Sequence, residues 1–162
     1  MKIEMVTIKT AEAAGQIHAL AWKAGYQGIL PQSYLDALSP QLWISRMKQA
    51  VYQDFLLKDH GHYVAASSLS PARDKNMSGW GEIVSLYVLP EHIRKGYGSA
   101  LLSYGIGQLQ AQGLNNIYLW VLEENHRARA FYEAMGFVPN GDRAALPIGG
   151  AEWYEIRYVN QR

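Results

Sequence analysis

The spacing of apolar residues along the chain alternates between two periods, and each change of period marks a change of element. Between positions 13 and 24, apolar residues recur every three or four positions, which is the spacing of one face of a helix. The stretch from Gly81 to Leu89 is mostly aliphatic and ends at a proline, which is typical of a strand. The stretch from Asn116 to Leu122 is almost continuously apolar, which predicts a strand at the centre of a sheet.

The whole pattern predicts helices and strands intermixed in the order β-α-α-β-β-β-α-β-α-β-β. This order favours one mixed α/β domain over residues 1–162, in which helices cover both faces of a sheet. The expected elements span residues 3–8, 10–24, 33–49, 54–58, 62–69, 81–89, 96–112, 116–122, 125–135, 137–140 and 152–158.

Local signals predict several of the boundaries. Thr10 is expected to cap the first helix, and Ser39-Pro40 to break the second. Asp59-His60-Gly61 should form the turn of a hairpin. Gly113 and Gly136 should each stop the helix that precedes them.

Composition and charge narrow the class of protein. The chain has 162 residues, with 15 Lys and Arg against 14 Asp and Glu, so its charge does not favour nucleic acid or an anionic membrane as a partner. It has no cysteine, which excludes disulfides, a thiol nucleophile and thiolate metal sites. The first residues do not resemble a signal peptide, and no stretch approaches the roughly 18 apolar residues of a membrane span. A cytoplasmic protein is the default expectation.

A glycine-rich segment between a strand and a helix is the first candidate for chemistry. Arg94-Lys95-Gly96-Tyr97-Gly98-Ser99 follows the strand that Pro90 ends. The first N–H groups of a helix lack internal partners and carry the positive end of the helix dipole, so they bind anions such as phosphate. A dinucleotide-binding fingerprint would need a third glycine where Leu101 stands. By itself, the segment is equally compatible with a helix start that binds nothing.

A second motif lies on the next predicted helix. Asn125 and Tyr132 are seven positions apart, which places them near one helical face. Together, the two segments resemble the GNAT superfamily of N-acetyltransferases. In that family, Arg/Gln-x-x-Gly-x-Gly/Ala binds the pyrophosphate of acetyl-CoA, and Asn-x-x-Ala-x-x-x-Tyr-x-x-x-Gly-Phe lies beside the pantetheine arm. The first position of the former pattern is Ile93 here, so phosphate binding would rest on backbone N–H groups and the two basic residues that follow.

The resemblance covers nearly the whole chain and is most specific from Glu82 to Phe137. It implies a mostly antiparallel sheet of six or seven strands with helices on both faces, in which strands four and five splay apart. It also implies acetyl-CoA as the cosubstrate. The residues that it assigns to this cosubstrate are Leu86, Tyr87, Val88, Ile93, Arg94, Lys95, Gly96, Tyr97, Gly98, Ser99, Asn125, Arg129 and Tyr132.

The reaction implied by the resemblance is direct transfer of an acetyl group to a primary amine in a ternary complex. An alkylammonium has a pKa of about 10.4, so a base must remove a proton before attack. Glu82 is the candidate base because it resembles, in position, the glutamate of the histone-acetylating branch. An ordinary acid at a strand start, or a chain of water molecules as the base, are the alternatives. Tyr132 is expected to protonate the leaving thiolate, and backbone N–H groups from Leu86 to Val88 to stabilise the oxyanion.

The acceptor is expected to be a small-molecule or protein amine, and pairing of two chains through the last strands is left open. His60 and His62 are interpreted as turn residues, so no metal site is predicted, and His18 is expected to be exposed. Four aromatic residues either wall the acceptor pocket, where they would hold an amine by cation–π contact, or fill the core. These residues are Trp22, Tyr26, Tyr34 and Trp80.

Two other functions compete with an acetyltransferase. A CoA-binding sensor or regulatory module would keep the fold and drop the chemistry, but the presence of Tyr132 and Glu82 argues against it. A different nucleotide-binding enzyme would use the glycine loop alone. The missing third glycine and the helix that carries Asn125 and Tyr132 argue against that alternative.

Overall fold

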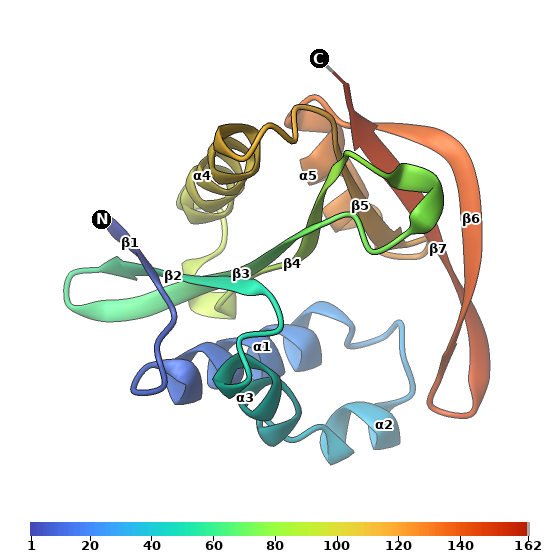
Figure 1. Cartoon of the computed structure of the whole chain (residues 1–162). Helices are drawn as coiled ribbons and strands as arrows, with labels where there is room; N and C mark the ends of the chain where they lie inside the picture. Colours follow the sequence, from blue (N-terminus) through green and yellow to red (C-terminus); the bar gives the residue numbers. More distant parts are fainter. Residues whose placement is uncertain (162) are drawn as a thin grey trace.

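The computed structural model describes residues 1–161 as one twisted sheet with helices packed on both faces (Figure 1). The seven strands lie in the order β1-β2-β3-β4-β5-β7-β6, and all neighbours are antiparallel except β4 and β5. The predicted fold class is therefore confirmed. The strands are β1 (Lys2–Met5), β2 (Gln53–Asp59), β3 (His62–Pro71), β4 (Gly81–Val88), β5 (Ile117–Leu122), β6 (Val138–Ile148) and β7 (Ala151–Asn160). The helices are α1 (Ala11–Gly25), α2 (Gln32–Ala37), α3 (Gln41–Lys48), α4 (Tyr97–Ala111) and α5 (His126–Ala134), with 3₁₀ turns at η1 (Lys75–Met77) and η2 (Pro90–His92).

The sheet separates two apolar clusters, because successive side chains of a strand point to opposite faces. Leu56 of β2 packs with α1 and α3, whereas its neighbour Leu57 packs with α4 on the other face. Gly15 of α1 lies where α1 crosses α3, and a Cβ at this position would stand 2.3 Å from Cγ1 of Ile44. A glycine is therefore required for the close approach of these two helices.

Most of the predicted turns and helix ends are found at the predicted residues. His60 and Gly61 both have positive φ, as a two-residue hairpin turn requires. Residues 38–40 separate α2 from α3, so the predicted break is confirmed. Gly113 and Gly136 follow α4 and α5 with positive φ and end them.

Thr10 stands at the N-cap of α1, as predicted, but its side chain makes no capping bond, because Oγ1 accepts a hydrogen bond from the N–H of Thr7 at 2.8 Å. The predicted end of the strand that begins near residue 137 is wrong. Strand β6 continues to Ile148, well beyond the predicted residues 137–140, and forms a long hairpin with β7. Its register shifts between Pro139 and Arg143, and most of its side chains are exposed, so the apolar alternation that reveals a strand is missing.

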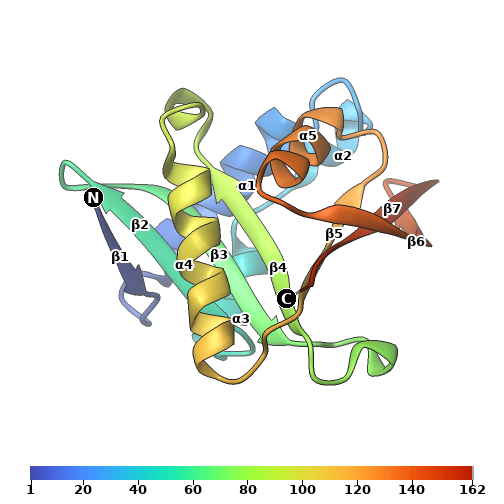
Figure 2. The ribbon, with the colours of Figure 1, turned by 90° about the horizontal axis from the view of Figure 1, so that it is seen from above.

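Strands β4 and β5 lie side by side at one end and separate along their length (Figure 2). The two strands pair only from Gly81 to Ile83, after which β4 continues beside β3 and β5 continues beside β7. The register of β3 against β4 shifts so that Val84 has no partner, which is a β-bulge at the point of separation. The predicted splay of strands four and five is confirmed.

No helix within residues 1–161 is long and apolar enough to cross a membrane. Within the same residues, no group of three or more His, Asp or Glu side chains is placed to hold a metal ion.

Candidate active site

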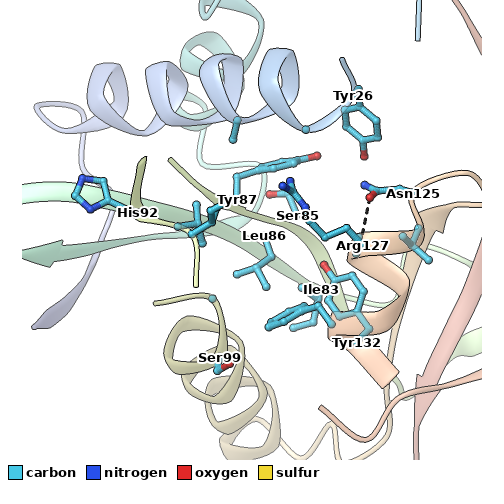
Figure 3. Close-up of a pocket in the computed structure, with 18 of the residues that line it drawn as sticks. Tyr26, Ile83, Ser85, Leu86, Tyr87, His92, Ser99, Asn125, Arg127 and Tyr132 are labelled. Carbon is cyan, nitrogen blue, oxygen red and sulfur yellow. Dashed lines mark hydrogen bonds between the residues drawn. The ribbon is translucent and has the colours of Figure 1, made fainter. Parts of the chain in front are cut away.

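The separation of β4 from β5 opens a cavity of about 380 Å³. Helix α1 borders it on one side, and the start of α4 together with α5 borders it on the other (Figure 3). The lining residues are Ala21, Gly25, Tyr26, Ile83, Val84, Ser85, Leu86, Tyr87, Val88, His92, Ile93, Arg94, Gly96, Gly98, Ser99, Trp120, Val121, Asn125, Arg127, Ala128, Phe131 and Tyr132. Eleven residues that the sequence assigns to the site are in this set: Tyr26, Leu86, Tyr87, Val88, Ile93, Arg94, Gly96, Gly98, Ser99, Asn125 and Tyr132.

The glycine loop forms the end of the cavity next to α4. Its backbone has positive φ at Arg94 and Gly96, and α4 begins directly afterwards. A Cβ at Gly96 would meet open space, whereas one at Gly98 would touch the ring of Phe131 at 3.5 Å. Since the first N–H groups of α4 have no acceptor within the helix, this end of the cavity fits a phosphate-bearing group. Ile93 lines the same end with a side chain that cannot bind phosphate.

Asn125 both caps α5 and faces the cavity. Its Oδ1 accepts a hydrogen bond from the N–H of Ala128 at 3.2 Å, drawn as the dashed line in Figure 3. Capping of this kind satisfies one of the free N–H groups at a helix start. Asn125 therefore stabilises the start of α5, and its contact with a cofactor stays a prediction.

Tyr132 projects its hydroxyl from α5 into the cavity (Figure 3). Its ring is fixed by edge-on contacts with Phe131 and Phe137, at centroid distances of 5.2 and 6.0 Å. Burial raises the pKa of this phenol well above its ordinary value, and the nearby Tyr26 raises it further. The hydroxyl therefore holds its proton at neutral pH and can donate it.

Helix α1 and β4 form the opposite wall, where a buried histidine meets a serine that lines the cavity. His18 is 0% exposed, so its predicted exposure is wrong. The Nδ1 atom of His18 lies 2.9 Å from the carbonyl oxygen of Ala14, and its Nε2 atom lies 3.0 Å from Oγ of Ser85. Burial lowers the pKa of His18 to about 4, so the imidazole is neutral at pH 7.

Three aromatic residues extend this wall. The indole N–H of Trp22 donates a 2.6 Å hydrogen bond to the hydroxyl of Tyr87, and the ring of Tyr26 lies 4.5 Å from that of Trp22. Tyr87 and Tyr26 face the cavity, whereas Trp22 lies behind them and is not part of the lining. Burial raises the pKa of Tyr87 well above its ordinary value, so this phenol is protonated too.

Glu82 lies outside the cavity lining and is 1% exposed. Its carboxylate accepts hydrogen bonds from the guanidinium of Arg73 and, at 2.7 Å, from the hydroxyl of Tyr118. Burial raises the pKa of Glu82, but the bonds from Arg73 and Tyr118 outweigh burial and lower it overall. A carboxylate in this state is a weak proton acceptor.

The other predicted site residues also stand away from the cavity. Tyr97 donates to Asp59 at 2.6 Å, and Arg129 donates to the hydroxyl of Tyr158 at 3.1 Å. Lys95 is exposed. The remaining two are aromatic residues in apolar clusters, Tyr34 with Leu30 and Leu35, and Trp80 with Met77 and Tyr118.

Four lining residues with side chains suited to binding were not predicted: Ser85, His92, Trp120 and Arg127. Trp120 lies between the buried Leu119 and Val121 and is itself only partly buried, which the apolar run of β5 conceals. The alternation of β4 beyond its bulge puts Ser85 and Tyr87 on one face, and this periodicity is the signal that would have found Ser85.

Comparison with known proteins identifies the family. The model of the acetyltransferase (GNAT) family matches residues 16–137, so the chain belongs to this family of acetyltransferases. It is 31% identical over 140 residues to the uncharacterized N-acetyltransferase YuaI of Bacillus subtilis strain 168, a match that covers 80% of this chain and 79% of that protein. The predicted class of enzyme, an acetyl-CoA-dependent acyltransferase, is confirmed at the level of the family.

Solved structures share the fold. One is smu.2055 of Streptococcus mutans UA159, with a TM-score of 0.77 and 18% identity over 99% of each chain. Another is the paia N-acetyltransferase of Thermoplasma acidophilum in complex with coenzyme A, with a TM-score of 0.74 and 19% identity over 96% of this chain and 98% of that one. At these identities the likeness is one of fold.

Proposed function

We propose that this protein transfers the acetyl group of acetyl-CoA to a primary amine by direct attack, with both substrates bound in the cavity at once. The observation that carries the proposal is the hydroxyl of Tyr132, which points into the same cavity that the glycine loop borders. Acetyl-CoA supplies an acetyl group activated as a thioester. Backbone N–H groups of Arg94 to Ser99 would hold its diphosphate, and β4 from Leu86 to Val88 would face its pantetheine arm.

Tyr132 would act as the general acid. The amine nitrogen bonds to the acetyl carbon, the carbon–sulfur bond breaks, and the sulfur takes the phenolic proton. The raised pKa of Tyr132 keeps this proton in place until the thiolate forms, and solvent then returns one to the phenolate. Backbone N–H groups at Leu86 to Val88 would stabilise the oxyanion, as predicted from the sequence.

The surroundings of Glu82 favour water over its carboxylate as the base that deprotonates the amine. Glu82 is committed to Arg73 and Tyr118 and stands outside the lining, so its role as the general base stays a prediction. An open cavity gives water access to the amine. Under this proposal Glu82→Gln retains most of the acetylation rate.

The acceptor proposed is an uncharged or singly charged amine that fits among aromatic rings, since Tyr26, Tyr87 and Trp120 line the cavity. The test measures release of free thiol from acetyl-CoA with n-butylamine, phenethylamine, benzylamine or L-phenylalaninamide, and detects the acetylated amine by mass spectrometry. We expect thiol release that requires an amine and matches the product mole for mole. Binding of acetyl-CoA with no transfer to any of the four amines would instead support a CoA-binding sensor.

A further inference from the structure

The bond between His18 and Ser85 has a direction that the surrounding groups determine. A carbonyl oxygen can only accept a hydrogen bond, so the Nδ1 atom of His18 must donate to Ala14. A neutral imidazole carries one N–H, and burial keeps this ring neutral at pH 7. The Nε2 atom therefore has a lone pair and accepts the proton of the Ser85 hydroxyl, at a separation of 3.0 Å.

This direction determines what Ser85 offers to the cavity. A serine hydroxyl has one proton and two lone pairs. Its proton is held by His18, which is completely buried, so the oxygen presents only lone pairs to a bound molecule. Ser85 can accept a hydrogen bond from that molecule and cannot donate one.

An acceptor of hydrogen bonds has a specific use beside an amine nucleophile. A neutral primary amine has two N–H groups and one lone pair, and the lone pair must remain free in order to attack. A freely rotating hydroxyl would donate into that lone pair and weaken the nucleophile. An oxygen that can only accept binds an N–H and leaves the lone pair free.

We propose that Ser85 accepts a hydrogen bond from an N–H group of the acceptor amine and thereby orients the lone pair of the amine for attack. In this proposal, His18 is the positioning residue, because it holds the hydroxyl proton of Ser85 and leaves Ser85 as a hydrogen-bond acceptor toward the cavity. The proposal rests on the proposed amine acetylation. Figure 3 shows Ser85 at the centre of the cavity wall, with the Tyr132 hydroxyl pointing into the same space from α5. In this arrangement the acceptor amine lies between Ser85 and the hydroxyl of Tyr132.

Ser85→Ala is the direct test, and Ser67→Ala is its matched control. Ser67 is also a buried serine on a central strand, and it donates a 2.8 Å hydrogen bond to the backbone carbonyl of Ser85 without lining the cavity. We expect Ser85→Ala to lower kcat/KM for the amine about tenfold, the effect of one hydrogen bond to an amine or ammonium. The Kd of CoA, measured by calorimetry, should stay within about twofold of the wild-type value. Ser67→Ala should change neither quantity.

A second measurement tests the direction of the hydrogen bond between His18 and Ser85, and it needs no substrate and no mutation. Nitrogen NMR of protein labelled with ¹⁵N-histidine distinguishes the two neutral tautomers of His18 at pH 7. We expect the tautomer protonated at Nδ1. A tautomer protonated at Nε2, or a doubly protonated ring, would make Ser85 a donor toward the cavity and overturn the proposal.

The kinetic outcomes separate this proposal from the proposed function. If the wild-type protein acetylates none of the four amines, the proposed function fails, and this inference fails with it. If the wild-type protein acetylates an amine and Ser85→Ala keeps the same kcat/KM, only the role of Ser85 is refuted. An equal loss in Ser67→Ala would show that Ser85 acts through folding alone, and would also refute it.

Discussion

The two walls of the cavity are built in different ways. The wall formed by the glycine loop and α5 uses contacts that are local in sequence, such as the capping bond from Ala128 to Asn125 three positions earlier. The wall formed by α1 and β4 depends on pairs that are far apart in sequence. His18 and Ser85 are separated by 67 positions, and Trp22 and Tyr87 by 65. The first wall is a property of contiguous motifs, whereas the second forms only when α1 packs on the sheet.

The walls also differ in electrostatics. The glycine loop offers the positive end of α4 and the exposed cation Arg94, which suits an anionic cosubstrate. The α1 wall offers neutral groups whose hydrogen-bonding direction is fixed, because His18 holds the proton of Ser85 and Trp22 donates to Tyr87. The first wall is therefore suited to an anionic group, and the second offers neutral hydrogen-bonding groups.

The largest expected effect is a loss of CoA affinity when a negative charge is added to the first wall. Gly98→Asp places a carboxylate beside the proposed diphosphate, and at about 4 Å and an effective dielectric of about 20 the repulsion is about 4 kcal/mol, or about a thousandfold in CoA affinity. Gly107→Asp is the control, because it adds the same charge to an exposed position of α4 where a Cβ meets nothing within 4 Å. Calorimetry with CoA measures both. Unchanged affinity in Gly98→Asp would show that the diphosphate binds elsewhere.

Removing the hydroxyl of Tyr132 from the same wall should lower the rate of transfer without weakening the binding of CoA. Tyr132→Phe keeps the ring contacts with Phe131 and Phe137 but removes the acid, so kcat should fall by about 10²- to 10⁴-fold while the Kd of CoA is nearly unchanged. In the wild-type protein, the raised pKa of Tyr132 keeps the acid protonated, so its deprotonation should cause no loss of rate as pH rises to 9. Steady-state rates between pH 6 and 9 measure both effects, and an unchanged kcat would remove Tyr132 as the acid.

The buried, neutral His18 of the second wall should make the free energy of unfolding depend on pH. Burial lowers the pKa of His18 to about 4, whereas an unfolded histidine has a pKa of about 6.5. Between these values the unfolded state binds the extra proton, so the free energy of unfolding should fall as pH decreases, by about 3 kcal/mol in all. Urea unfolding from pH 4 to 7.5 measures this loss.

The matched variants for this pH dependence are His18→Gln and His126→Gln. His126→Gln removes an exposed imidazole and serves as the control, whereas His18→Gln should flatten the slope. An equal slope in wild-type protein and His18→Gln would mean that the buried imidazole titrates as it does in the unfolded chain. The neutral character of the second wall would then be refuted.

The smallest effect is expected at the cap of α5. Asn125→Ala removes the hydrogen bond to the N–H of Ala128 and should lower the free energy of unfolding by about 1 kcal/mol. Asn125→Asp keeps an acceptor oxygen and should restore the stability but place a negative charge on the cavity lining. A stability of Asn125→Ala equal to that of the wild-type protein would show that the cap contributes nothing.

The difference between the walls also explains what the sequence could predict. The glycine loop and the face that carries Asn125 and Tyr132 are readable because their residues are contiguous or two helical turns apart. The splay was predicted only through the family resemblance that these two motifs carry. The bond between Ser85 and His18 was not predictable because it joins β4 to a helix 67 positions earlier in the chain. The surroundings of Glu82 were equally hidden, since Arg73 comes from the loop after β3 and Tyr118 from β5. Motifs determined by local spacing were found, and contacts that depend on packing were not.

Under the proposed function, both walls are occupied at the same time during transfer. Initial rates measured over a grid of acetyl-CoA and amine concentrations distinguish this from sequential occupation. We expect double-reciprocal lines that intersect, because the amine attacks while acetyl-CoA is still bound. Parallel lines would mean that the acetyl group first moves to the protein and that the first product leaves before the amine binds, and would refute direct transfer.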